Sequence, residues 1–246
     1  MAQEQVDEFS RSAVALMDAV RDVPNESFRK VLYLVMIDGL SSMRYRRTLS
    51  PSERFAKFVR NYAQWHEGER VSLPQAKLYI EAYGGGEELL REVVCRLTAW
   101  QYGRIYDLNN DPLPRELPAT QDILRACQHF WLLWALRNSL IHGFRHPAFA
   151  HDHLAADRDA AFYHGEIGSN QWRLAYPDGF IRRLASNCLQ GVVGWLREQG
   201  NGLLPASGRG LWVDRPAKKG KRAEMQWLLV PSAFVAGLIV GKARRP

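Results

Sequence analysis

Residues 120–146 have the sequence TQDILRACQHFWLLWALRNSLIHGFRH, which predicts the helix around which the rest of the chain is built. Thr120 is a predicted N-cap, Asp122 places a negative charge in the first turn, and Gly143 is expected to close the far end. Apolar residues occupy most sides of this helix, so we expect other helices to surround it. Because burial of charged groups is costly, an Arg and a His at its end indicate a functional site or a paired interface.

The polar residues at the end of this predicted helix are Arg137, Asn138 and His142. Residues four apart on a helix lie within about 40° of each other, whereas residues five apart are separated by about 140° and about 7.5 Å of rise. Asn138 and His142 therefore share a face, and Arg137 has to reach around the helix to join them. One copy supplies half a site at best, and two copies about a two-fold axis would bring two Arg and two His around one cleft.

The pattern Arg137-Asn138-x-x-x-His142 at the C-terminal end of a long apolar helix resembles the motif of the HEPN superfamily. Residues 31–73 are also similar to a prokaryotic, plasmid-associated branch of that superfamily, and the resemblance extends over about residues 27–199. It implies an all-helical domain that dimerises through its motif helices, and a metal-independent endoribonuclease of a toxin or phage-defence type. The implied partners are an RNA substrate, a second copy of the chain and an antitoxin protein.

The chemistry that this resemblance implies needs a base for the 2′-OH proton, an acid for the leaving 5′-oxygen and a cation for the phosphorane. His142 is expected to act as base or acid, one copy from each protomer, for roughly 10²-fold to 10⁴-fold each. Arg137 would stabilise the transition-state phosphate, and Asn138 would orient the substrate or His142. A cyclic phosphate is the expected product, DNA is expected to be inert, and neither a metal nor a cofactor is expected.

Spacing alone does not single out this pair of residues, because random Arg-His pairs at such gaps are common in a chain of this composition. Pro147 breaks one rival pair out of helix, and another leads into a predicted strand. The pair Arg60 and His66 remains an alternative, because it also ends a predicted helix and also has Asn after Arg. We prefer Arg137 and His142 because their helix is the most apolar. The four pairs are Arg60/His66, Arg137/His142, Arg145/His151 and Arg158/His164.

The rest of the sequence predicts a mainly α fold, a HEPN-like helical bundle over residues 1–200 with a small β-hairpin, followed by a basic extension over residues 201–246. A long polar loop, residues 101–118, is expected to deliver the chain to the central helix. The hairpin is predicted at residues 160–167 and 171–176. The other predicted helices cover residues 6–20, 27–43 with an interruption at Asp38-Gly39, a segment beginning at Ser50-Pro51, a short segment from Pro74 to the glycines at 84–86, and residues 87–100 and 180–198.

Two features of the second predicted helix bear on the site. Asp38 is either a partner for an active-site Arg or His, or an acid that faces solvent or pairs with Arg44, and we prefer the second interpretation because structural ion pairs are common. Arg44, Arg46 and Arg47 form a basic cluster that is either a solvated face or, beside an RNA cleft, a track for phosphates.

The charge of the chain is concentrated at its C-terminal end. Residues 1–200 have a net charge of zero, and residues 201–246 hold nine basic and two acidic side chains. Lys218 and Lys219 therefore belong to an extension that either holds a polyanion non-specifically or is a solvated linker. The apolar segment 228–240 is too short for a span of about 20 residues, so we expect it to form strands or dock on the domain, with no membrane partner.

The N-terminus and the cysteines predict where the protein is found, and two other classes of function remain open. The N-terminus lacks the apolar core of a signal peptide, and Cys95, Cys127 and Cys188 lie in apolar helical patterns without zinc-site spacing, so a cytoplasmic protein with reduced, buried thiols is expected. His151-Asp152-His153 lacks the further ligands of a metal site. Two alternatives to the nuclease stay open: a non-catalytic HEPN-like dimerisation or partner-binding module, which the neutral first 200 residues favour, and an unrelated helical regulator in which the Arg and His only cap a helix.

Overall fold

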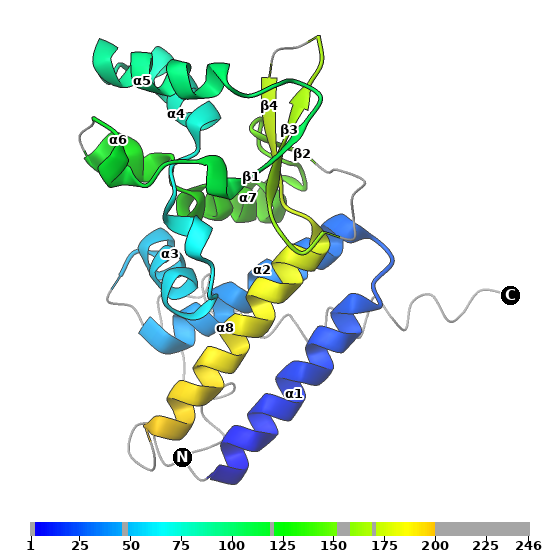
Figure 1. The fold of residues 1–246 in the computed structure, drawn as a ribbon. Coiled ribbons are helices and arrows are strands. Elements are labelled where there is room, and N and C mark those ends of the chain that lie inside the picture. The colour runs from blue at the N-terminus through cyan, green and yellow to red at the C-terminus, as the bar shows by residue number, and fades with distance from the viewer. Residues whose placement is uncertain (1–2, 46–48, 119–120, 152–157, 169–170, 200–246) are drawn as a thin grey trace, which may run out of the picture. The chain divides into compact units, whose positions relative to one another are not determined.

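A computed structural model describes residues 3–45, 49–118, 121–151, 158–168 and 171–199. These residues form a mainly helical protein with one small sheet, as predicted (Figure 1). Of the described residues, 3–14 and 193–199 belong to one compact unit and the rest to a second. The helices are α1 (Gln3–Arg21), α2 (Glu26–Tyr45), α3 (Pro51–Tyr62), α4 (Leu73–Tyr83), α5 (Glu87–Thr98), α6 (Gln121–Ala126), α7 (His129–Gly143) and α8 (Asp178–Glu198).

Two helices of the second unit begin where their caps predict. The Ser50 side chain accepts a hydrogen bond from the backbone of Glu53, and the Glu53 carboxylate accepts one from the backbone of Ser50, which completes a capping box at α3. At α4 the Ser72 side chain accepts a hydrogen bond from the backbone N–H of Gln75, and the helix is closed by Gly84, whose φ of 82° suits a residue without a Cβ. Local sequence therefore fixes the start of α3 and both ends of α4.

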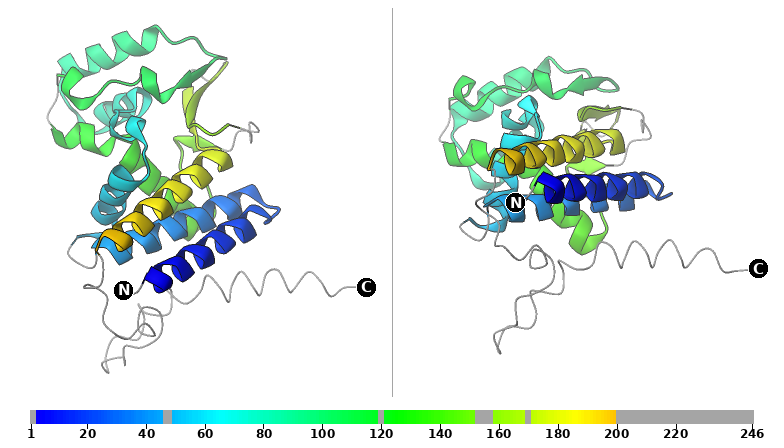
Figure 2. Two further views of the ribbon diagram at one scale, coloured as in Figure 1. Left: turned by 60° about the horizontal axis from the view of Figure 1, so that its bottom comes forward. Right: turned by 90° about the horizontal axis from the view of Figure 1, so that it is seen from below.

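The helix α2 is continuous through Asp38 and Gly39, so the predicted interruption is wrong. The Ser41 and Ser42 hydroxyls both donate to the carbonyl of Asp38, at 2.8 and 2.9 Å, within the helix. A Cβ added at Gly39 would meet nothing within 4 Å. The glycine is therefore an unstrained helical residue, and packing of α2 against α3 and α7 outweighs its low helix propensity (Figure 2).

The predicted central helix is divided into α6 and α7 by a turn at Cys127 and an extended residue, Gln128. The backbone of this segment pairs with residues 70–72: Ser72 N donates to the Cys127 carbonyl at 2.9 Å, and His129 N donates to the Arg70 carbonyl at 3.2 Å. These long-range hydrogen bonds replace helical ones, which apolar periodicity does not reveal. Gln128, rather than Thr120, therefore caps the part of the helix that carries the motif, and Thr120 lies outside the described residues.

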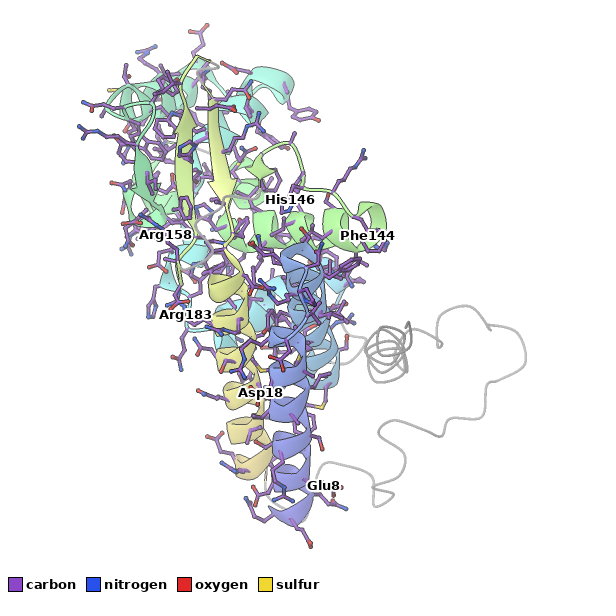
Figure 3. The ribbon with its side chains drawn as sticks, turned by 90° about the vertical axis from the view of Figure 1, so that its right-hand side faces the viewer. Glu8, Asp18, Phe144, His146, Arg158 and Arg183 are labelled. Atoms are coloured by element: carbon purple, nitrogen blue, oxygen red, sulfur yellow. The ribbon has the colours of Figure 1, made fainter. Side chains whose placement is uncertain are left out.

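The far end of α7 also differs from the prediction. Gly143 is the last helical residue, and Phe144 takes the left-handed conformation that closes the helix, with φ 47° and ψ 34°. This conformation is unfavourable for a residue with a large side chain. Figure 3 shows Phe144 where α7 ends, and its side chain is 70% exposed.

The predicted hairpin is present as β3 (Phe162–Glu166) and β4 (Gln171–Ala175), which pair antiparallel with Tyr163 opposite Leu174. Two edge strands were missed. β1 (Ile105–Asp107), in the predicted polar loop, pairs antiparallel with β3, and the two-residue β2 (Ala150–His151) pairs parallel with β4, which gives the order β1-β3-β4-β2. Both are too short for an alternating pattern to stand out. The same loop holds 3-10 helices η3 (Leu108–Asn110) and η4 (Pro114–Glu116), and η2 (His66–Glu69) follows α3.

Several sequence predictions concern residues outside the described part or need correction. Arg46, Arg47, Lys218, Lys219 and segment 228–240 lie outside it. All three cysteines are free; Cys127 and Cys188 are buried as expected, but Cys95 is exposed. Among the described helices, none is long and apolar enough to cross a membrane. In the first unit, Arg197 pairs with Asp7 at 2.9 Å.

Candidate functional site

The Arg137 guanidinium is held by three neighbours on α2 and α7. Its Nη2 atom donates to Asp38 Oδ2 at 2.5 Å, and its Nη1 atom donates to Asn138 Oδ1 at 2.9 Å. Its Cζ atom lies 4.8 Å from the centre of the Trp134 ring, a cation–π distance. Only 14% of the Arg137 side chain is exposed, so the charge is fixed in direction and mostly desolvated.

Asp38 is the partner of the motif arginine, so the interpretation that we preferred from sequence, an acid facing solvent or pairing with Arg44, is wrong. The Asp38 side chain is 20% exposed, and its Oδ1 atom is buried without a hydrogen-bond partner among the described residues. Arg44 instead donates from Nε to the Tyr62 hydroxyl at 2.6 Å. Asp38 and Arg44, six positions apart on α2, therefore have different partners.

His142 lies in the last turn of α7 and is exposed. Within the described residues its side chain has no hydrogen-bond or ionic partner, whereas Asn138 contacts Arg137 directly. One chain thus joins Arg137 and Asn138 but leaves the imidazole free on the surface. This agrees with the helical geometry, which separates residues five apart by about 140°.

An exposed aromatic pair lies at the end of α7. The rings of Phe28 on α2 and Phe144 after α7 meet edge to face with centroids 6.0 Å apart. Both side chains are exposed. Exposed aromatic rings beside a partly formed site are typical of the core of a protein interface.

The alternative pair Arg60 and His66 does not share a helix. α3 ends at Tyr62, Gln64 takes a positive φ of 52°, and His66 begins η2. Arg60 forms a 3.3 Å ion pair with Glu69. Of the other two pairs, His151 lies in β2 and His164 in β3, so neither forms a helical motif.

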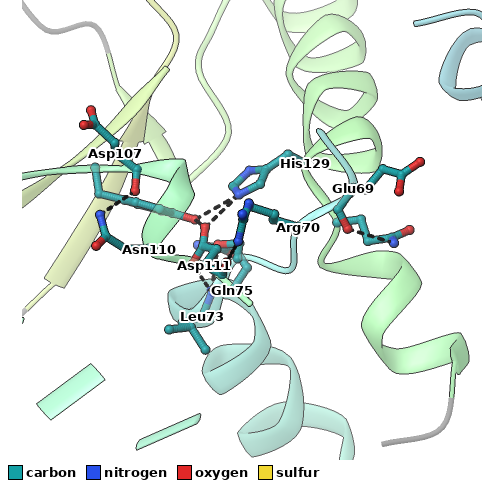
Figure 4. Close-up of polar contacts among 11 residues, drawn as sticks. Glu69, Arg70, Leu73, Gln75, Asp107, Asn110, Asp111 and His129 are labelled. Atoms are coloured by element: carbon teal, nitrogen blue, oxygen red, sulfur yellow. Dashed lines mark hydrogen bonds and ion pairs between the residues drawn. The ribbon is translucent and has the colours of Figure 1, made fainter. Parts of the chain in front are cut away.

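A buried polar network that sequence reasoning missed lies where α7 begins (Figure 4). Asp111 Oδ2 lies 2.8 Å from His129 Nε2 and accepts from the Tyr163 hydroxyl at 2.6 Å, and Asp111 Oδ1 accepts from Leu73 N at 3.1 Å. Arg70 donates to the Asp111 carbonyl at 2.6 Å. A hydrogen-bonded acid and histidine also occur in active sites, so this network is a second candidate for a catalytic site.

Burial argues that this network is structural. Asp111 and His129 are 1% and 0% exposed, so a substrate cannot reach them. Burial also raises the pKa of Tyr163 well above its usual value, which keeps the hydroxyl a donor to the carboxylate. Because Leu73 is the first residue of α4, the carboxylate also lies at a helix N-terminus, which favours negative charge. Sequence gave little sign of this role, since Asp111 lies in a loop rich in Asn, Asp and Pro.

A shallow apolar pocket of about 230 Å³ lies on the side of α4 and α6. It has no carboxylate, imidazole or guanidinium among its lining residues. Nor do the described residues hold any group of three His, Cys, Asp or Glu side chains that could bind a metal ion. Its lining is Gln75, Leu78, Tyr79, Tyr83, Ala126, Cys127 and Leu132.

Comparisons of the chain with protein-family models, with curated proteins and with solved structures find no match.

Proposed function

We propose that the chain is a metal-independent endoribonuclease of the toxin or phage-defence type, which acts as a homodimer with Arg137, Asn138 and His142 of both copies around one cleft. The observation that carries the proposal is the fixed Arg137 guanidinium, held between Asp38, Asn138 and Trp134 on the helix that presents an unpaired His142. A buried arginine needs a compensating partner, and Asp38 supplies it here.

The roles proposed for His142 and Arg137 follow from the proton and the charge that each side chain can offer to RNA. The imidazole of His142 takes the 2′-OH proton, and the same residue of the second copy protonates the leaving 5′-oxygen. Arg137 carries permanent charge, so it stabilises the extra negative charge of the phosphorane without any proton transfer. Its Nε atom is buried and without a partner among the described residues, and Asp38 and Asn138 hold the other two nitrogens. Orientation of the guanidinium is thus set before substrate binds.

The exposed pair Phe28 and Phe144 supports the dimer. A two-fold axis near the end of α7 would cover both rings and bring the two His142 side chains together. The strained φ of Phe144 points the same way, because a non-glycine residue in this region is retained where the surroundings make use of it.

The alternative function is a non-catalytic dimerisation or partner-binding module, such as one that binds an antitoxin. The ion pair between Arg137 and Asp38 favours it, because an arginine whose charge is compensated within its own chain has a structural role without any substrate. Both functions use the same surface, so only activity separates them.

Cleavage of total RNA by the purified protein in the presence of a chelator tests the nuclease. His142→Ala and Arg137→Ala should each abolish cleavage and leave the dimer, measured on a sizing column, intact. His66→Ala is the matched control, since it removes an exposed imidazole from the alternative pair, and it should cleave like the wild type. Cleavage that persists in both motif variants would rule out the assignment, and a dimer without cleavage in the wild type would establish the binding module.

A further inference from the structure

A second group of cations lies on α2 and α3, around the ring of Tyr45. Arg44 Cζ is 5.0 Å and Lys57 Nζ is 5.1 Å from the ring centroid. The Tyr45 hydroxyl accepts a hydrogen bond from Asn61 Nδ2 at 2.7 Å, which ties the ring to α3. Two positive charges are therefore held near one aromatic ring.

The acids of this region are engaged elsewhere. Neither Lys57 nor Arg54 has a carboxylate within ion-pair distance among the described residues, and Arg54 Nε is buried without a partner there. Glu53, the nearest acid on α3, bonds to Ser50 and pairs with Arg125 at 3.6 Å. Concentrated like charges raise the local potential, and a bound anion relieves it.

Helical geometry puts this group in line with the motif arginine. Asp38 and Tyr45 are seven residues apart on α2, so they lie about 20° apart around the helix and about 10.5 Å apart along it. On α3, Arg54 and Lys57 are three residues apart and share a side. Because Asp38 holds Arg137, the group around Tyr45 lies further along α2 from the proposed site.

We propose that this α2–α3 surface, formed by Arg44, Tyr45, Arg54 and Lys57, binds backbone phosphates of single-stranded RNA that flank the bond cut at Arg137. The inference rests on the proposed function for the identity of the polyanion. Phosphate contacts fix the position of a strand without reading its sequence. The cations over Tyr45 are suited to phosphates rather than to a stacked base, since they already lie over its ring.

The test measures binding of a fluorescent single-stranded RNA by anisotropy over a range of salt concentrations, in a His142→Ala background so that the probe is not cut. Lys57→Gln should weaken binding roughly three- to tenfold and lower the slope of log affinity against log salt by about 0.7, the value for one phosphate contact on a single strand. Lys57→Glu should weaken it further. Lys57 is exposed, so neither change disturbs the core.

Lys77 on α4 gives the matched control, because it is an exposed helical lysine paired with Glu81 at 3.4 Å. Lys77→Gln and Lys77→Glu should leave affinity and slope unchanged. Equal affinities for the Lys57 and Lys77 variants would overturn the inference. So would a Lys57→Glu variant that loses affinity for polyglutamate but not for RNA, which would assign the surface to an acidic protein segment.

Cleavage assays separate this inference from the proposed function. If the wild type does not cut RNA but Lys57→Glu still weakens RNA binding, the nuclease fails and the binding surface stands. If the wild type cuts RNA through His142 and the Lys57 variants bind normally, only the surface fails.

Discussion

The ion pair between Arg137 and Asp38 predicts a measurable coupling between two helices. The perturbations are Asp38→Ala, Arg137→Met and the double variant, compared with the wild type. Hydrogen bonds to charged groups contribute about 1.5–3 kcal/mol, whereas exposed ion pairs contribute about 0.2–1 kcal/mol. With side chains 14% and 20% exposed and a 2.5 Å contact, this pair lies between those classes, and we expect a coupling free energy of about 1–2 kcal/mol.

The single variants should differ in a defined order. Asp38→Ala leaves Arg137 its contacts with Asn138 and Trp134, so the loss in free energy of unfolding should be about 1.5 kcal/mol. Arg137→Met also removes the cation–π contact and strands a half-buried carboxylate, so the loss should be about 2–3 kcal/mol. The double variant should lose less than the sum of the two.

Urea unfolding of the four proteins, at one fixed protomer concentration, measures these values. The slopes against urea should agree, since the variants expose similar surface on unfolding. A coupling below about 0.3 kcal/mol would show that the two residues act independently and would refute the contact. In the proposed nuclease, Asp38→Ala should also lower cleavage by roughly 10- to 100-fold, because the guanidinium is no longer held in place.

Two further predictions concern packing and thiol chemistry. Gly68→Ala should lower the free energy of unfolding by about 1–3 kcal/mol, because the new Cβ would lie 2.2 Å from the buried Phe130 ring. The control Gly39→Ala, in mid-helix with nothing within 4 Å of the new Cβ, should raise it by up to about 1 kcal/mol. Equal effects of the two changes in thermal unfolding would contradict the packing around Gly68. In the native protein iodoacetamide should label Cys95 alone, since Cys127 and Cys188 are buried and burial raises the pKa of Cys127 to about 12. In urea all three cysteines should be labelled. Native labelling of Cys127, detected by mass spectrometry, would contradict its burial.

Local signals predicted the elements that depend on local chemistry. The Ser50 capping box, the start of α4 beside Pro74 and the antiparallel pairing of β3 with β4 are each determined within a few residues. The wrong predictions concern long-range contacts. Nothing near Cys127 indicates that its carbonyl accepts from Ser72, 55 residues earlier, and this hydrogen bond helps to divide the central helix.

The same distinction applies to the site. The motif spacing predicted that Asn138 and His142 share a face and that Arg137 reaches around the helix to join them. Among the described residues Arg137 does reach Asn138, but no contact joins it to His142. The role of Asp38 did not follow, because the choice between a solvated acid and a partner of Arg137 depends on how α2 crosses α7. Spacing also could not exclude Arg60 and His66 from a common helix, which fails through the positive φ of Gln64.

The buried network and the candidate site are connected through α7. Asp111 fixes the first residue of this helix through His129, and the Arg70 carbonyl accepts the backbone N–H of the same residue. From His129 the helix runs without a break to Gly143, so its start determines the rotation at which Arg137 meets Asp38. A guanidinium needs a direction as well as a charge to act on a phosphate, and that direction is set by an acid buried at the opposite end of the helix.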